Sequence, residues 1–393
     1  MPAPGCHIIL SYRELDPVPA SRNTLLLSAN IAWNIVNFRM GLIAALQSDG
    51  WTIVVCAPND RDSEAQLARL GIRFVPMPID AKGLSSIADL RTFLAYRDIM
   101  RTVRPDAFLG WTIKPNIYGG LAARSLGIPA IANISGLGTA FIRDNMLTKV
   151  VSGLYRFGLA RARTVFFQNA TDRDLFVERS MVRERQTCLL PGSGIDLARF
   201  ATAEPDLREK GHFLMIARLL GDKGVREFVA AARLLKARGL RARFGLLGFL
   251  DVANRTAITR SEVDAWVAEG LIDYHPPVED VRAMIATADA VVLPSYREGT
   301  SRVLLEACAL ARPVIATDVP GCREIVDDGV NGFLCAARDP VSLAAAMEKL
   351  LKLDDGQWIA MASAARLKVE AEFAEQRVFD AYRVALADMA PTH

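Results

Sequence analysis

The sequence predicts an α/β protein made of two doubly wound domains, each a parallel sheet with helices on both faces. Short apolar runs alternate with helical patterns along the chain, which is typical of repeated strand–helix–strand units. With 393 residues the chain is too long for one ordinary core, so two domains of about 150–200 residues are expected. Its 51% apolar and 23% charged residues exclude a disordered chain.

The predicted strands fall into two groups. In the first half, the apolar runs expected to form strands cover residues 24–28, 52–57, 74–76, 107–110, 130–134, 164–168 and 187–190. Helical patterns lie between them, for example at 38–47 and 90–103. The pattern restarts in the second half, with strands expected at 212–217, 242–248, 272–275, 290–294 and 313–317. Each half therefore has enough strands for a sheet of its own.

A turn-rich segment at 191–200 marks the expected join between the halves, because it contains two glycines, a proline and a serine. The last helical pattern, at 373–389, is a candidate to cross back onto the first domain. The expected organisation is an irregular extension at 1–22, a first domain at 23–192, a second domain at 193–372, and a final helix within 373–393.

Composition narrows the functional classes. The six cysteines are scattered without CxxC spacing or flanking histidines, which argues against zinc or a disulfide framework and suits a reducing cytoplasm. The N-terminus lacks a basic and then apolar signal, and no apolar run reaches about 18 residues, so we expect neither export nor a membrane span. Residues 1–195 carry 22 Lys and Arg against 15 Asp and Glu, whereas the remainder carries 25 against 29, so the first half is basic.

Two glutamates, Glu298 and Glu306, lie eight positions apart directly after the predicted buried strand at 290–294. Glu298 falls in the turn that leaves the strand, and Glu306 about a turn and a half into a helix that Ser301 can cap. Both carboxylates can face the cleft at the carboxyl end of a parallel sheet, where open α/β folds bind ligands. Carboxylates there suit neutral polyols, because each accepts hydroxyl protons in charge-assisted hydrogen bonds. The alternative is one loop glutamate and one surface glutamate.

Two cations, Arg218 and Lys223, lie five positions apart between the strand at 212–217 and the next helix. Such charges can clasp both phosphates of a nucleotide diphosphate, arginine as a planar fork and lysine as a point charge. They would stabilise the negative charge on a departing diphosphate. No Asp-x-Asp motif stands in a suitable loop, so we expect chemistry without a metal or cofactor. The alternative is two solvated surface cations.

These motifs resemble the retaining nucleotide-sugar glycosyltransferases of family four, which have the GT-B fold with two Rossmann-like domains facing a central cleft. Glu298 and Glu306 match the family pattern E-x7-E, and Arg218 and Lys223 match R-x4-K-G. The resemblance implies that Glu298 contacts the donor sugar, that Glu306 contacts the ribose, and that Arg218, Lys223 and Glu298 carry catalysis. It further implies donor contacts from Val278, Gly299, Thr300, Ser301 and Arg302, the last three through backbone amides near the diphosphate. Gly248 ends the strand at 242–248 and lets the backbone approach a ligand closely, so we expect a donor contact there too; the alternative is a plain turn.

The first domain would hold the acceptor, while the second holds the nucleotide sugar. After its first strand, Asn34 and Arg39 lie in a polar segment suited to sugars and a phosphate, and no G-x-G-x-x-G dinucleotide motif is present there. Lys114 and Asn116 follow the strand at 107–110, just before a helix. We expect acceptor contacts from all four residues. The alternative is a pair of ordinary helix starts with solvent-facing side chains.

Residues 28–40, 110–119 and 134–141 resemble one branch of this family, whose members build capsule, O-antigen or glycan precursors on polyprenyl-diphosphate lipids. The resemblance implies transfer of a hexose or N-acetylhexosamine from a UDP-sugar to a lipid-linked sugar. The helical segments 90–104 and 145–163 combine apolar residues with Arg and Lys, and such a surface can lie on an anionic leaflet. We therefore expect a cytoplasmic protein in peripheral contact with the inner face of the membrane. The alternative is a core face plus a solvated face.

Two other functions stay open at this point. A nucleotide-sugar epimerase on the same fold would need acidic and histidine groups at the cleft, and no histidine lies between His7 and His212. A non-catalytic sugar- or lipid-binding subunit is the second, although the intact carboxylate and cation pairs argue against a decayed site. Nucleic acid is not an expected partner, because the basic residues are not interleaved with aromatic residues in one strip.

Overall fold

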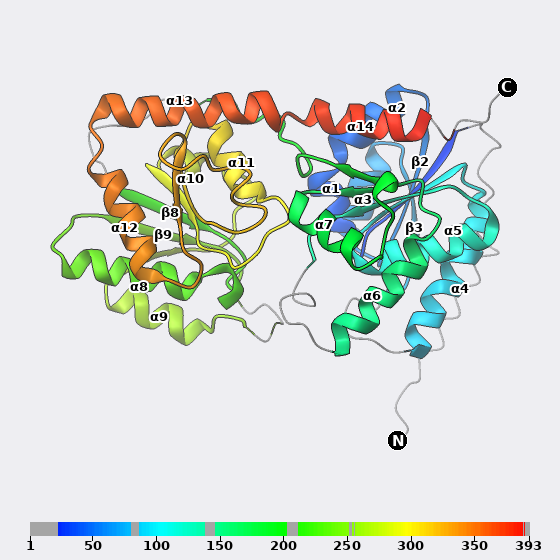
Figure 1. Ribbon diagram of the computed structural model, residues 1–393, viewed down its shortest axis with the longest axis horizontal. Coiled ribbons are helices and arrows are strands. Elements are labelled where there is room, and N and C mark those ends of the chain that lie inside the picture. Colours follow the sequence, from blue (N-terminus) through cyan, green and yellow to red (C-terminus); the bar gives the residue numbers. More distant parts are fainter. Residues whose placement is uncertain are drawn as a thin grey trace, which may run out of the picture.

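The computed structural model describes residues 23–79, 86–137, 146–202, 211–250, 254, 256–387 and 389. Two parallel sheets, each covered by helices, form the two halves of the molecule (Figure 1). The predicted fold class of two doubly wound α/β domains is confirmed. The extension expected at 1–22 lies outside the described residues, and so does the end of the motif at 134–141.

Among the described residues of the first domain, seven parallel strands pair in the order β3-β2-β1-β4-β5-β6-β7. Their bounds are β1 Thr24–Ser28, β2 Thr52–Ala57, β3 Arg73–Pro76, β4 Ala107–Trp111, β5 Ala130–Ile134, β6 Thr164–Phe167 and β7 Thr187–Leu189. Every side chain of β1 is buried, because helices cover both faces of the sheet. In register with it, Leu26 lies opposite Val54 of β2 and Phe108 of β4.

The described part of the second domain contains six parallel strands in the order β10-β9-β8-β11-β12-β13. They are β8 His212–Ile216, β9 Arg243–Leu247, β10 Asp273–His275, β11 Ala290–Leu293, β12 Val314–Thr317 and β13 Gly332–Cys335. The strand list from the sequence omits β13, because its four residues directly follow the turn residues Gly329 and Asn331. Gly332 lets β13 approach β12 closely, since a Cβ there would lie 2.0 Å from the carbonyl oxygen of Val314.

Helices and single turns connect these strands. In the first domain they are α1 Ala32–Phe38, α2 Met40–Ser48, α3 Arg61–Arg69, α4 Ser86–Val103, the π-helix η2 Pro115–Gly119, α5 Gly120–Leu126, α6 Met146–Leu159, α7 Ala170–Glu178 and the 3₁₀ turn η4 Glu184–Gln186. In the second they are the 3₁₀ turn η5 Gly221–Lys223, α8 Val225–Ala237, α9 Arg260–Ala268, α10 Arg282–Ala286, α11 Arg302–Ala309, α12 Pro340–Leu351, α13 Asp355–Glu372 and α14 Glu375–Ala387.

One predicted helix differs from the structure. The helix expected at 38–47 corresponds to α2, which begins only at Met40 because the backbone of Arg39 leaves the helical conformation with a φ of −129° and a ψ of 0°. The side chain of Arg39 turns into the protein instead, and its guanidinium lies 5.3 Å from the centre of the Trp111 ring. Arg39 therefore separates α2 from the short helix α1 that precedes it.

The chain crosses between the domains twice, at adjacent places. Ile195 in the first crossing donates its amide to the carbonyl of Phe373 (2.9 Å) and accepts from the amide of Glu375 (3.1 Å) in the second. Beyond this pairing, α13 lies on the second domain and α14 on the first (Figure 1). The hydroxyl of Tyr382 in α14 accepts hydrogen bonds from the Trp111 indole (3.1 Å) and the Asn133 amide (2.9 Å). The last described helix is thus part of the first domain's core.

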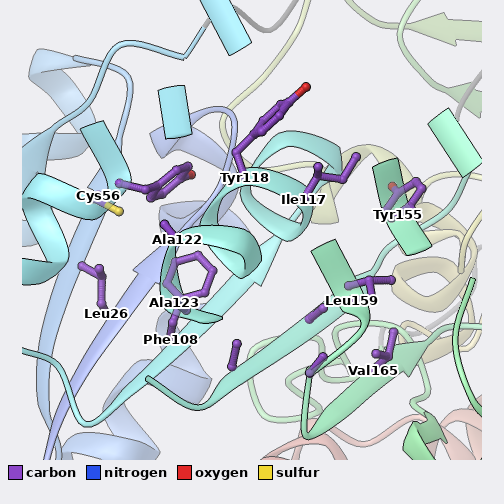
Figure 2. Packing of buried hydrophobic residues seen from close by; sticks show 14 of the residues in the cluster. Leu26, Cys56, Phe108, Ile117, Tyr118, Ala122, Ala123, Tyr155, Leu159 and Val165 are labelled. Carbon is purple, nitrogen blue, oxygen red and sulfur yellow. The ribbon is translucent and has the colours of Figure 1, made fainter. Parts of the chain in front are cut away.

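The helix α14 packs on one face of the first sheet, and the opposite face packs on η2, α5 and α6 (Figure 2). Figure 2 shows Phe108 of β4 beside Ala122 and Ala123 of α5, and Val165 of β6 beside Leu159 of α6. Gly158 lets α6 approach η2 closely, because a Cβ there would lie 2.7 Å from the Cα of Ile117. This packing fixes the position of α6 on the domain.

Candidate active site

The loop between β11 and α11 places Glu298 at the carboxyl end of the second sheet. Ser301 begins α11, since its Oγ accepts a hydrogen bond from the amide of Leu304 (3.4 Å). A Cβ on Gly299 would lie 2.2 Å from the carbonyl oxygen of Ser135, just after β5 in the first domain. The Gly321 turn, with a φ of +83°, packs against the other side of this loop. The loop is therefore held between the two domains.

Lys223 and Glu298 form an ion pair, with Nζ and Oε1 2.5 Å apart. Their side chains are 20% and 13% exposed, so the pair is only partly screened by water. Gly224 permits this geometry: it has a φ of +78°, and a Cβ there would lie 2.1 Å from the carbonyl oxygen of Pro294. The amide of Tyr296 also donates to the carbonyl of Asp222 (2.9 Å). The turn after β8 and the loop after β11 are thus joined.

Glu306 lies in the first turns of α11 and pairs with Arg302 at 2.9 Å. Burial raises the pKa of Glu306, and the charge of Arg302 opposes that shift. The same guanidinium contacts Ser193 Oγ (3.3 Å) and the carbonyl of Gly194 (3.4 Å) in the crossing segment, and it lies 5.5 Å from the centre of the Phe38 ring. We had expected only the backbone amide of Arg302 to act. Its side chain connects Glu306 with the crossing and the first domain.

The remaining donor-side residues lie at the same edge of the sheet. Arg218 follows β8, Gly248 follows β9 and Val278 follows β10, next to the loop after β11. Parallel strands end at one edge, which is where such sheets bind ligands. Gly248 packs directly on the residue that follows β8, since a Cβ there would lie 1.8 Å from the carbonyl oxygen of Ala217. The side chain of Val278 is 43% exposed. These residues therefore share one edge of the sheet, and Val278 is still open to solvent there.

Arg218 differs from Lys223 in its surroundings. It is exposed, and its guanidinium makes no ion pair or hydrogen bond with the rest of the described chain. The structure therefore brings Lys223 and Glu298 together and leaves Arg218 available at the edge of the same face.

Several residues that contact the loop between β11 and α11 were missed by the sequence analysis. Arg297, next to Glu298, forms an ion pair with Asp172 at the start of α7 in the first domain. Asp172 has no exposed surface, and burial raises its pKa against the opposing charge of Arg297. Asn169 Nδ2 donates to the carbonyl of Gly299 (3.0 Å), and Thr300 Oγ1 donates to that of Gln168 (3.1 Å). No local pattern signals these contacts, because the partners lie more than a hundred residues apart.

Comparison with known families agrees with this two-part site. The family model for "Glycosyl transferases group 1" matches residues 210–353, and that for "Glycosyl transferase 4-like" matches residues 24–169. The two matches fall on the two domains and together span most of the chain. The chain belongs to these glycosyltransferases.

Relatives and solved structures agree with the family. The glycosyltransferase is 26% identical over 336 residues to the N,N'-diacetylbacillosaminyl-diphospho-undecaprenol alpha-1,3-N-acetylgalactosaminyltransferase of Campylobacter jejuni, covering 81% of this chain and 87% of that protein. It is 24% identical to the capsular polysaccharide biosynthesis glycosyltransferase CapM of Staphylococcus aureus, covering 78% and 82%.

Two solved structures share the fold. The glycosyltransferase of Rickettsia africae superposes with a TM-score of 0.77 at 16% identity, covering 94% of this chain and all of that one. Anabaena HepE in complex with UDP-glucose superposes with a TM-score of 0.75 at 17% identity, covering 93% and 99%. These likenesses show the GT-B fold.

The four residues expected at the acceptor have different surroundings in the glycosyltransferase. Asn34 is half-buried on α1, whereas Arg39 is 4% exposed and burial lowers its pKa. Lys114 forms a buried ion pair with Asp89 of α4 at 2.8 Å. Asn116 Nδ2 donates to the carbonyl of Asn133 (2.8 Å). The ammonium group of Lys114 and the Nδ2 atom of Asn116 are therefore engaged within the first domain, whereas Asn116 Oδ1 is buried without a partner among the described residues. A contact with acceptor stays a prediction for all four residues.

Two kinds of feature are absent from the described residues. No group of three or more His, Cys, Asp or Glu side chains gathers there in a way that could hold a metal ion. Across the same part of the glycosyltransferase, no helix combines the length and apolar character needed to cross a membrane.

Proposed function

We propose that this glycosyltransferase is a retaining, metal-independent hexosyltransferase. It moves a hexose or N-acetylhexosamine from a UDP-sugar to a sugar linked to a polyprenyl diphosphate, in the synthesis of a surface polysaccharide or glycan. The observation that carries the proposal is the face formed by Arg218, Lys223 and Glu298 at the carboxyl end of the second sheet. It presents cations for a diphosphate beside a carboxylate for sugar hydroxyls.

Each donor-side residue has a role in this proposal. Lys223 and Arg218 bind the diphosphate, together with the backbone amides at the start of α11 (Thr300, Ser301 and Arg302). Glu298 accepts hydrogen bonds from hydroxyls of the donor sugar, and Glu306 from those of the ribose. The base lies along Gly248 and Val278. Because the donor residues follow four neighbouring strands, one extended nucleotide sugar can contact all of them.

The reaction follows from these roles. The acceptor hydroxyl oxygen bonds to the anomeric carbon on the face that the diphosphate leaves, so the anomeric configuration is kept. The bond from that carbon to the phosphate oxygen breaks, and its electron pair leaves with UDP. The hydroxyl proton passes to a phosphate oxygen of UDP. Lys223 and Arg218 stabilise the charge that develops on the diphosphate, which removes the need for a metal ion.

The acceptor side of the proposal rests on the first domain. The Campylobacter relative acts, by its name, on a diphospho-undecaprenol sugar. Here α4 and α6 carry exposed apolar side chains beside exposed cations such as Arg91 and Arg156. Such a surface suits peripheral contact with an anionic leaflet, here the inner face of the cytoplasmic membrane. Asn34 and Arg39 are the acceptor contacts nearest the first strand.

A panel of nucleotide sugars tests the function. Each is incubated with the purified protein in EDTA, with and without a polyprenyl-diphosphate-linked sugar, and release of nucleotide diphosphate is measured. We expect acceptor-dependent release from one UDP-sugar, and a product whose anomeric configuration by NMR matches the donor. Interconversion of a donor without UDP release would instead indicate an epimerase. Loss of activity in EDTA that Mg²⁺ restores would contradict metal independence.

A further inference from the structure

An apolar groove lies on the first domain between α4 and α6, with η2 and α5 between them. Its volume is about 730 Å³, within the range of sites that enclose small ligands. Its lining includes Leu90, Phe93, Leu121, Val150 and Leu154. Close packing at Gly120, where a Cβ would lie 2.7 Å from the carbonyl oxygen of Gly158, holds α5 against α6. The backbone packing of α5 on α6 therefore fixes the shape of the groove on this side.

Exposed apolar side chains surround the groove. Leu90 and Val150 on its lining are 57% and 49% exposed, and Leu94 and Phe157 on the same two helices are 45% and 64% exposed. Exposed cations, Arg91, Lys149 and Arg156 among them, flank these residues. An apolar surface with cations around it suits a lipid leaflet with anionic headgroups.

One end of the groove lies at the edge of the sheet where the donor loop docks. The helices α4 and α6 follow β3 and β5 of the same parallel sheet, so both begin at its carboxyl edge. Gly299 contacts Ser135 and Gly136 at the end of β5, and the chain then continues to α6. A ligand can thus have its reactive end beside Glu298 and an apolar tail between α4 and α6.

We propose that this groove binds the isoprenoid chain of the acceptor lipid, which rests on the proposed function. Two features favour such a chain over a folded partner. The lining is mainly apolar, its acidic member, Asp89, is paired with Lys114 at 2.8 Å, and its two basic members, Arg124 and Arg161, are exposed. The groove also shares the sheet edge at which the sugar of the same acceptor would react. The groove binds the first isoprene units, and the remainder of the chain stays in the bilayer.

Photo-crosslinking tests the groove with a defined probe, geranylgeranyl diphosphate with a benzophenone at its chain end. Two matched variants separate the groove from the surface around it. Leu90→Gln/Val150→Gln alters two exposed lining residues, and Leu94→Gln/Phe157→Gln alters two exposed residues outside the lining on the same helices. We expect labelled peptides from α4 or α6, about tenfold weaker probe binding in the first variant, and binding close to wild type in the second. Unlabelled geranylgeraniol should compete for the site.

Several outcomes would overturn the proposal. Equal losses in both variants would mean adsorption to an apolar surface, and no loss in either, or no label on these helices, would place the chain elsewhere. Competition by inorganic diphosphate alone would mean headgroup recognition, and competition by phosphatidylglycerol vesicles alone would mean an acyl-chain site. Transfer to a short-chain, water-soluble acceptor reports on the proposed function separately. That acceptor has no isoprenoid chain to bind, so a failure of this activity in the wild-type protein counts against the proposed function and not against the groove.

Discussion

Lys223 Nζ and Glu298 Oε1 lie 2.5 Å apart, so the cation assigned to the diphosphate holds the carboxylate assigned to the sugar. A bound diphosphate offers Lys223 a second anionic partner, and donor hydroxyls offer Glu298 new donors. The ion pair therefore holds both side chains in place. Each charge also spares the other the free-energy cost of being unpaired in a partly buried site.

Replacing Lys223 separates its two roles. In Lys223→Ala, the Glu298 carboxylate loses its partner, so we expect a loss of about 1–3 kcal/mol in the free energy of unfolding and of about 10²–10³ in turnover. In Lys223→Ala/Glu298→Gln, stability should return towards wild type while turnover stays low. Urea unfolding and UDP release measure the two effects. Full recovery of turnover in the double variant would contradict the phosphate role of Lys223.

Arg218 offers the complementary case, because it is exposed and has no partner in the described chain. Arg218→Ala should change stability by less than about 0.5 kcal/mol but lower turnover by about 10² or more. Arg218→Lys should recover only part of the loss, since lysine lacks the planar fork. The substitution of Arg226, an exposed arginine paired with Glu262, by Ala is the control for surface charge. A wild-type rate in Arg218→Ala would remove this residue from the mechanism.

The ion pair of Arg297 and Asp172 joins the donor loop to the first domain. Arg297→Met leaves a fully buried, uncompensated carboxylate, and we expect a loss of about 3–5 kcal/mol in the free energy of unfolding. Arg297→Met/Asp172→Asn removes both charges and should recover most of that loss. Denaturant unfolding of Arg297→Met, Asp172→Asn and the double variant measures the coupling energy between the two charges. Additive losses would show that the two charges act independently.

Burial of the Glu306 carboxyl predicts opposite effects of its replacement on the free energy of unfolding, which depends on pH, and on the affinity for UDP. Its pKa is raised by burial, so its contribution to stability is fully present below the pKa of an unfolded glutamate and is lost as pH rises through the raised folded pKa. Glu306→Gln should therefore gain stability relative to wild type at pH 8 but not at pH 4, while its affinity for UDP falls. Thermal unfolding across this range checks the sign, with Glu279→Gln on the exposed surface as control. A gain confined to acid pH would contradict the raised pKa.

The sequence predicts the fold better than it predicts the contacts within the site. Strand β5 was expected at 130–134 and lies at Ala130–Ile134, because apolar runs and turn residues are local signals. The break at Arg39 was missed, since it depends on burial of that side chain over Trp111. The ion pair of Arg297 with Asp172 was also missed, because it depends on a tertiary contact between the two domains.

The side chains of the first domain show the same limit. A strand end followed by Lys114 and Asn116 predicts polar residues near a ligand edge, but it does not predict whether they are already paired. In the structure, Lys114 Nζ pairs with Asp89, and Asn116 Nδ2 donates to the carbonyl of Asn133. These partners come from elements before and after the segment, so no spacing within it reveals them.

The central claim is tested most directly by the initial rate of UDP release with a lipid-linked sugar acceptor in EDTA, compared between wild type and Arg218→Ala/Lys223→Ala. We predict acceptor-dependent release by wild type and a loss of at least about 10²–10³ in the double variant, with folding checked by circular dichroism. A folded double variant that releases UDP at the wild-type rate would contradict the assignment of these cations to the departing diphosphate.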